Sequence, residues 1–261
     1  MLANLHRILT TIGCLPVLAL AACGGDARGD PPGVQDSSSV PPNVTISLDY
    51  TTARSGAAIA RSYAETTRVL ADQILVSGGR LRVVVSAGAG VAPAELVDEV
   101  VPFERDLRGN ARKRYLVKAR GALALLVDQA LGIVPADNPR LQAALAAMST
   151  DGSDVAGAVL HETDLLTAHG GGTLYVLSDG LQRGPEIDFA STIEAISDAD
   201  AIAKLKPLLP AAATDVAIDI RGVGLNGAPN VSTERSSKLE RVWDAACTST
   251  GSPQCSVSTD V

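Results

Sequence analysis

Two aspartates stand at the ends of apolar, strand-like runs. Asp49 closes the run VTISLD, which begins at Val44, and Asp179 follows the run LYVLS of residues 174–178. In open α/β sheets, ligands bind in the crevice beyond the carboxyl ends of the strands. A carboxylate there needs solvent, helix amides or a cation as its partner. Either aspartate alone could simply cap the next helix or turn, but their shared placement predicts a binding site at this edge of a sheet.

The elements around these aspartates alternate between strand and helix patterns. We expect strands over residues 44–49, 81–86, 100–107 (a short edge strand), 174–178 and 216–220, and helices over residues 55–75, 111–131, 139–148, 155–168, 200–206 and 233–247. Such alternation implies right-handed crossovers within one sheet. The fold class predicted is therefore α/β: a doubly wound, mostly parallel sheet with helices on both faces.

Several segments, in this order, resemble the landmarks of a von Willebrand factor A (vWA, integrin I-like) domain. They are Asp49-Tyr50-Thr51-Thr52-Ala53, then residues 152–159 (GSDVAGAV), then residues 174–180 (LYVLSDG), and finally the strand that ends in Gly222-Val223-Gly224. The resemblance covers most of residues 44–247. It implies a Rossmann-like fold that serves adhesion or protein interaction.

The vWA resemblance also implies a metal-ion-dependent adhesion site. Asp49 and Thr51 match the family's Asp-x-Ser/Thr-x-Ser motif, Ser153 stands where the family has a Thr, and Asp179 matches its last Asp. Such a set of oxygen ligands suits Mg²⁺ or Mn²⁺. Ala53 departs from the motif because it replaces a coordinating Ser, and two expectations stay open: a divalent ion with water in the vacated place, or a site that works without metal.

The first 22 residues have the pattern of a cleaved signal peptide. Arg7 precedes a mostly apolar run over residues 8–20, which is shorter than the roughly 20 residues a spanning helix needs. Leu20-Ala21-Ala22-Cys23 then resembles the lipobox of bacterial lipoproteins. That resemblance implies that Cys23 becomes the first mature residue and carries fatty acyl chains. The chain is thus expected to be exported and lipid-anchored in the bacterial cell envelope.

Two further cysteines fit an exported protein. With Cys14 in the signal peptide and Cys23 lipidated, Cys247 and Cys255 remain, and we expect them to form a disulfide. Residues 24–43 hold four Gly, four Pro and three Ser, a composition typical of a flexible tether. The expected organisation is a signal peptide (1–22), a lipidated cysteine with its tether (23–43) and one vWA-like domain with a disulfide-pinned tail (44–261).

Composition excludes some partners and leaves three functions open. The 261-residue chain has a net charge of −7 and only 3% aromatic residues, which argues against nucleic-acid binding. The leading hypothesis is a membrane-anchored, surface-displayed module that binds an unknown protein partner and is not an enzyme. A metal-independent envelope scaffold or assembly factor is the alternative. A metal-assisted hydrolase using Asp49 and Asp179 is the third, but the sequence shows neither a nucleophile nor a base for it.

Overall fold

A computed structural model gives the fold of residues 42–88, 90–91, 93–103, 106–148, 152–225 and 232–261. The expected signal peptide, Cys23 and all but the end of the expected tether lie outside these described residues. Residues 41–261 form one compact unit. The described hydrophobic core lies within this unit. A compact unit with its own hydrophobic core is expected to fold independently.

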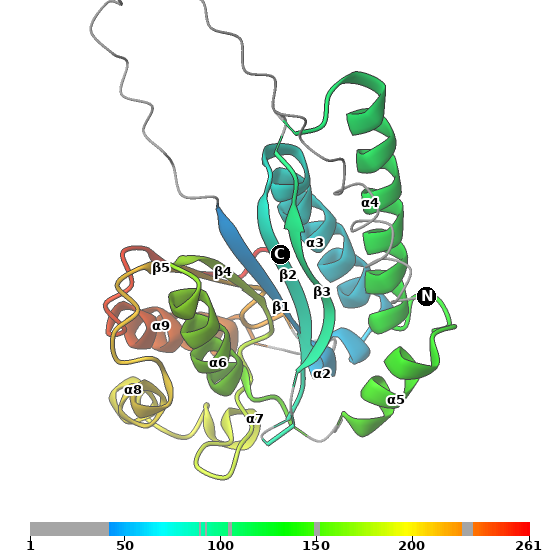
Figure 1. Ribbon diagram of the computed structural model, residues 1–261. Helices are drawn as coiled ribbons and strands as arrows, with labels where there is room; N and C mark the ends of the chain where they lie inside the picture. The colour runs from blue at the N-terminus through cyan, green and yellow to red at the C-terminus, as the bar shows by residue number, and fades with distance from the viewer. Residues whose placement is uncertain (1–41, 89, 92, 104–105, 149–151, 226–231) are drawn as a thin grey trace, which may run out of the picture. The chain divides into compact units, whose positions relative to one another are not determined.

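Six strands form one sheet (Figure 1). They are β1 (Asn43–Asp49), β2 (Gly79–Ser86), β3 (Ala94–Val101), β4 (Gly172–Leu177), β5 (Val216–Arg221) and β6 (Cys255–Ser258). Their order is β3-β2-β1-β4-β5-β6, in which β3 pairs antiparallel with β2 and every other pair is parallel. The chain builds outward from β1 in both directions, which confirms the predicted doubly wound, mostly parallel α/β class.

The helices cover both faces of this sheet. The elements are α2 (Tyr50–Arg54), α3 (Ala57–Ser77), α4 (Gly109–Ala130), α5 (Pro139–Ala147), α6 (Val155–Ala168), α7 (Phe189–Thr192), α8 (Asp198–Leu205), the 3₁₀ turn η1 (Lys206–Leu208) and α9 (Thr233–Thr248). Helix α3 packs on β1 and β2 and also packs against α4, whereas α6 packs on β1 and β4. The chain moves in opposite directions across the sheet through α3 and α6, so right-handed crossovers place these helices on opposite faces, as Figure 1 shows.

The central strand is buried almost along its whole length. In β1 only Asn43 is partly exposed, and both Ile46 and Leu48 are fully buried. This is the pattern of a parallel strand covered on both faces. Asp49 is the last residue of this strand and the N-cap of α2, so it stands at the carboxyl edge of the sheet.

Three details differ from the predicted elements. The edge strand lies at Ala94–Val101 rather than over residues 100–107, because Asp98 pairs with Arg80 of β2 and fixes the antiparallel register. The helix expected over residues 55–75 begins at Ala57 as α3, because Gly56 is extended, and the short helix α2 before it was not predicted. The four-residue strand β6 was not predicted from the sequence.

The predicted disulfide is confirmed. Cys247 at the end of α9 is bonded to Cys255 at the start of β6, with the two Cα atoms 5.9 Å apart. The bond therefore holds the last strand against the last long helix. Among the described residues, none of the helices combines the length and the apolarity that a bilayer crossing requires.

Candidate functional site

The Asp49 carboxylate is the centre of a dense hydrogen-bond network. As the N-cap of α2, its Oδ1 accepts from the backbone amides of Thr51 (3.0 Å) and Thr52 (3.2 Å). Its Oδ2 accepts from the hydroxyls of Thr52 (3.0 Å) and Ser178 (2.7 Å), and also from that of Ser153. Asp49 is only 2% exposed. One buried carboxylate thus satisfies five donors from three separate loops.

These loops are also tied to one another directly. The Thr51 hydroxyl donates to the carbonyl of Gly152 at 2.9 Å, and the amide of Arg183 donates to the carbonyl of Ser153 at 2.7 Å. All four residues predicted as metal ligands therefore belong to loops that meet at the carboxyl ends of β1 and β4. Asp49, Thr51 and Ser153 are linked through hydrogen bonds, and Asp179 lies close enough to Asp49 to feel its charge.

Asp179 is a buried carboxyl group with few partners. Its Oδ1 accepts from the amide of Leu181 at 2.9 Å, and the residue is 6% exposed. Burial, and next the negative charge of Asp49, raise the pKa of Asp179 to about 7. The group therefore titrates in the neutral range.

The loop that carries Asp179 is held by the last part of the chain. The indole Nε1 of Trp243, on α9, donates to the carbonyl of Gly180 at 2.8 Å. Gly180 has a φ of 73°, and a Cβ there would lie 2.8 Å from that indole nitrogen, so only glycine fits. The amide of Gly224 donates to the carbonyl of Asp179 at 2.8 Å. Asp179 is thus positioned by β5 and α9 as well as by β4.

Four residues of the site were not identified from the sequence. Thr52 and Ser178 donate to Asp49, and Gln182 bridges to the start of α6 through the amide of Ala156 (2.9 Å). Tyr63 is fully buried under the site, and no hydrogen bond of standard geometry reaches its hydroxyl from the described residues. Burial, then the charges of Asp49 and Asp179, keep the pKa of Tyr63 well above its ordinary value. The available signal was position along the chain: Thr52 lies three residues after Asp49, and Ser178 directly precedes Asp179.

The oxygen atoms at this site are of the type that a hard divalent cation prefers as ligands. Two carboxylates lie near each other, and the hydroxyls of Thr51 and Ser153 give their protons to Gly152 and Asp49, so their oxygen lone pairs remain free to ligate. Ala53 is buried and offers only a methyl group. In the described part of the chain, no group of three or more His, Cys, Asp or Glu side chains gathers as a metal cluster. Any cation here would therefore depend on hydroxyl and water oxygens besides the two aspartates.

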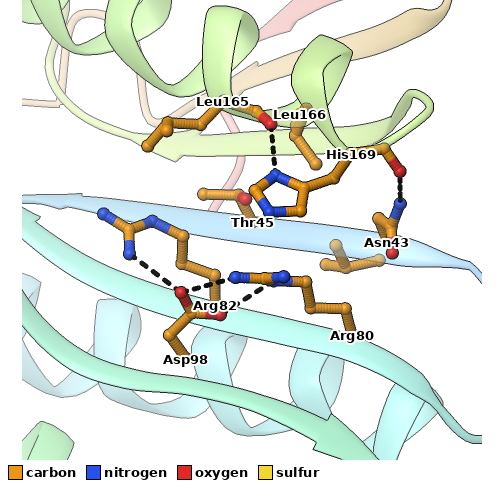
Figure 2. A pocket seen from close by; sticks show the side chains of 9 residues that line it. Asn43, Thr45, Arg80, Arg82, Asp98, Leu165, Leu166 and His169 are labelled. Carbon is orange, nitrogen blue, oxygen red and sulfur yellow. Dashed lines mark hydrogen bonds and ion pairs between the residues drawn. The ribbon is translucent and has the colours of Figure 1, made fainter.

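A separate small cavity lies at the other end of β1 (Figure 2). It has a volume of about 50 Å³, which is room for little more than water. Its charged side chains are already paired. Arg80 forms a bidentate ion pair with Asp98, with both N–O distances 2.8 Å, and the Nε of Arg82 donates to the buried carboxylate of Glu162 at 2.9 Å. The cavity lies beside the amino end of β1, about 20 Å along the strand from Asp49. We regard this charge network as structural.

Comparisons with known proteins give weak likenesses only. No protein-family model matches the chain, and no curated protein matches it either. Among solved structures it is similar to a von Willebrand factor type A protein from Catenulispora acidiphila, at 16% identity and a TM-score of 0.40, over 84% of this chain but 38% of that one. It is also similar to the N-terminal domain of TFIIH p34, at 14% identity and a TM-score of 0.40, over 82% of this chain and 90% of that one.

A third likeness is to proximal thread matrix protein 1 from the mussel byssus, in a structure with a zinc-occupied MIDAS motif. The identity is 12% and the TM-score 0.33, over 80% of this chain and 48% of that one. Likenesses of this strength carry no argument about function. The fold class therefore rests on the strand order and the helices on both faces.

Proposed function

We propose that this chain is a vWA-like protein-interaction module whose binding face is the carboxyl edge of the sheet. The observation that carries the proposal is the convergence of Asp49, Thr51, Ser153 and Asp179 at that edge from three loops. Loops at strand ends on a rigid sheet are where binding residues usually lie.

We further propose that a divalent cation, Mg²⁺ or Mn²⁺, binds at these four residues. Asp49 and Asp179 would supply negative charge, and Thr51 and Ser153 would supply neutral oxygens. A bound cation would offer an open position to a carboxylate of the partner, as the vWA resemblance implies. Because Ala53 contributes no ligand, we expect an affinity in the millimolar rather than the micromolar range.

The surroundings of the site also suit a protein partner. Two open hollows, of about 440 and 410 Å³, share Arg54 and Gly132 and border α2, which begins directly after Asp49. Their walls expose polar and apolar atoms in comparable amounts, and the Arg54 guanidinium bonds to the hydroxyl of Tyr50 at 3.2 Å. A mixed apolar and cationic surface beside the edge of the sheet gives a partner more contact area than the four polar residues alone.

Calorimetric titration with Mg²⁺ and then with Mn²⁺ tests the cation. We expect a saturable heat for the wild-type chain and its loss, or at least a tenfold weaker binding, for Asp179→Asn, because one of two carboxylates is removed. Asp164→Asn is the matched control, since Asp164 is exposed on α6 and lies outside the site. It should bind like the wild type. Absence of heat at ion concentrations well above the expected millimolar dissociation constant, or equal heat from Asp179→Asn, would end the cation proposal.

A metal-independent scaffold is the second candidate, and one observation favours it. The five donors around Asp49 are satisfied by the chain itself, so the three loops meet without help from an ion. Affinity capture from envelope extracts, with Mg²⁺ or with EDTA, separates the two candidates. Recovery of the same partner in EDTA and by Asp179→Asn would favour the scaffold, whereas loss of that partner in both would favour the cation-dependent module.

We also propose that the chain is exported and anchored in the cell envelope through acylated Cys23. The support is the signal-like segment and the lipobox-like run that ends at Cys23. Two or more acyl chains give stable anchoring. Metabolic labelling with a clickable fatty acid should mark the mature wild-type protein and leave Cys23→Ser unmarked. An unlabelled wild-type protein, or equal labelling of Cys23→Ser, would contradict the anchor.

A further inference from the structure

Helix α4 presents an exposed face that combines cations with aliphatic side chains. At 100° per residue, six positions fall within about 140° of the helix circumference. These residues, which we call the α4 cationic face, are Lys113, Arg114, Val117, Lys118, Gly121 and Leu125. Val117 is 63% exposed and Leu125 is 47% exposed. Two large aliphatic side chains therefore stand in solvent among three positive charges.

The described residues leave the positive charges of this face unpaired. Helix α4 has five cations and one acid, Asp128, in a chain whose net charge is −7. Arg112 bonds to the carbonyl of Val76 and Arg120 pairs with Asp72, so these two tie α4 to α3. Lys113, Arg114 and Lys118 are exposed, and the described residues offer them no ion pair or side-chain hydrogen bond. Three cations thus remain available to an external partner.

The shape of the face suits a flat partner. Helix α4 has 22 residues and is therefore about 33 Å long. It packs on α3 and also contacts the edge strand β3, and Figure 1 shows it beside α3. Gly121 lies in the middle of the face, and the space above it is open. An extended surface can therefore approach the length of the helix.

We propose that the α4 cationic face docks on the surface of an anionic phospholipid bilayer. Charge complementarity is the first reason, since lysine and arginine near such a surface each contribute about 1 kcal/mol. The exposed Val117 and Leu125 are the second, because a bilayer interface accepts aliphatic side chains together with cations, whereas a soluble polyanion offers them nothing. The docked module would lie on its α3/α4 side. The carboxyl edge of the sheet would stay accessible.

Vesicle binding tests this directly. The chain from residue 24 onward lacks Cys23 and the apolar leader but keeps the compact unit of residues 41–261. We expect it to bind vesicles of 30% phosphatidylglycerol in phosphatidylcholine at least tenfold more tightly than phosphatidylcholine alone. Binding should weaken strongly between 50 and 500 mM salt. The variant Lys113→Glu/Arg114→Glu/Lys118→Glu should lose roughly a hundredfold in affinity.

Two matched variants make the result decisive. Arg140→Glu/Lys204→Glu/Lys206→Glu makes the same charge change at exposed sites outside α4 and should bind within threefold of the wild type. Val117→Ser/Leu125→Ser should bind anionic vesicles about tenfold more weakly and heparin unchanged. Equal loss in both charge variants, or no preference for phosphatidylglycerol, would overturn the proposal. Heparin binding lost in the α4 charge variant, with vesicle binding unaffected by the serine changes, would instead assign the face to a soluble polyanion.

Discussion

Replacing Asp49 by alanine should lower the free energy of unfolding by at least about 3 kcal/mol. The change removes one acceptor that serves two backbone amides and the hydroxyls of Thr52, Ser153 and Ser178. A buried donor left without an acceptor costs about 1–3 kcal/mol, and each hydroxyl can recover part of that cost by rotating toward another group. Several donors are affected at once, so the loss is a large share of the 5–15 kcal/mol typical of a whole domain.

Urea denaturation measures this effect with a reporter that the chain already contains. Trp243 is the single tryptophan, is fully buried, and bonds to the carbonyl of Gly180 beside the site. Its fluorescence should therefore follow unfolding directly. Asp164→Asn should change stability by less than about 0.5 kcal/mol, since Asp164 is exposed. A loss of less than about 1 kcal/mol for Asp49→Ala would show that the network around Asp49 does not hold the three loops together.

The second large effect is a dependence of stability on pH that originates at Asp179. Burial and the charge of Asp49 raise the pKa of Asp179 to about 7 in the folded chain, from 3.8 for an ordinary Asp. Between these two values the folded state holds a proton that the unfolded state has released. Stability from this group is therefore full below about pH 4 and falls as the pH rises toward 7, by at most about 1.4 kcal/mol per pH unit.

The variant Asp179→Asn isolates that dependence. We expect it to be more stable than the wild type at pH 8, by up to about 4 kcal/mol, and equally stable at pH 4. Urea denaturation from pH 4 to pH 8, with EDTA present to exclude bound ions, gives the difference between the two proteins at each pH. Other titrating groups cancel in that difference. A difference that stays constant with pH would contradict the neutral-range titration of Asp179.

These two aspartates behave differently because their surroundings differ. Asp49 accepts five hydrogen bonds. Asp179 accepts one from the amide of Leu181, and its weaker interactions with Thr52 and Arg235 do not outweigh its burial and the repulsion of Asp49. Asp49 holds the three loops together through these hydrogen bonds. The surroundings of Asp179 disfavour its ionised form. Removing Asp49 should therefore destabilise the fold, while neutralising Asp179 should stabilise it at pH 8.

The fold class followed from the sequence because its signals are local. Apolar runs such as residues 44–49 and 174–178 report burial on both faces, and the helical spacing between them reports the crossovers. Cys247 and Cys255 lie eight positions apart, which was enough to expect their disulfide. The two aspartates at strand ends could be placed at one edge because parallel strands bring their carboxyl ends together.

The tertiary structure alone decided what those aspartates contact. Ser178 and Ser153 donate to Asp49 across 129 and 104 positions of the chain, and Tyr63 lies buried beneath both carboxylates. Strand β3 was misplaced because its polar residues hide the strand pattern, and its register depends on the pairing of Arg80 with Asp98. The local hydrophobic pattern indicates which residues are buried and whether they lie in a helix or a strand. Hydrogen-bond partners and pKa values depend on distances in space, which only the folded chain sets.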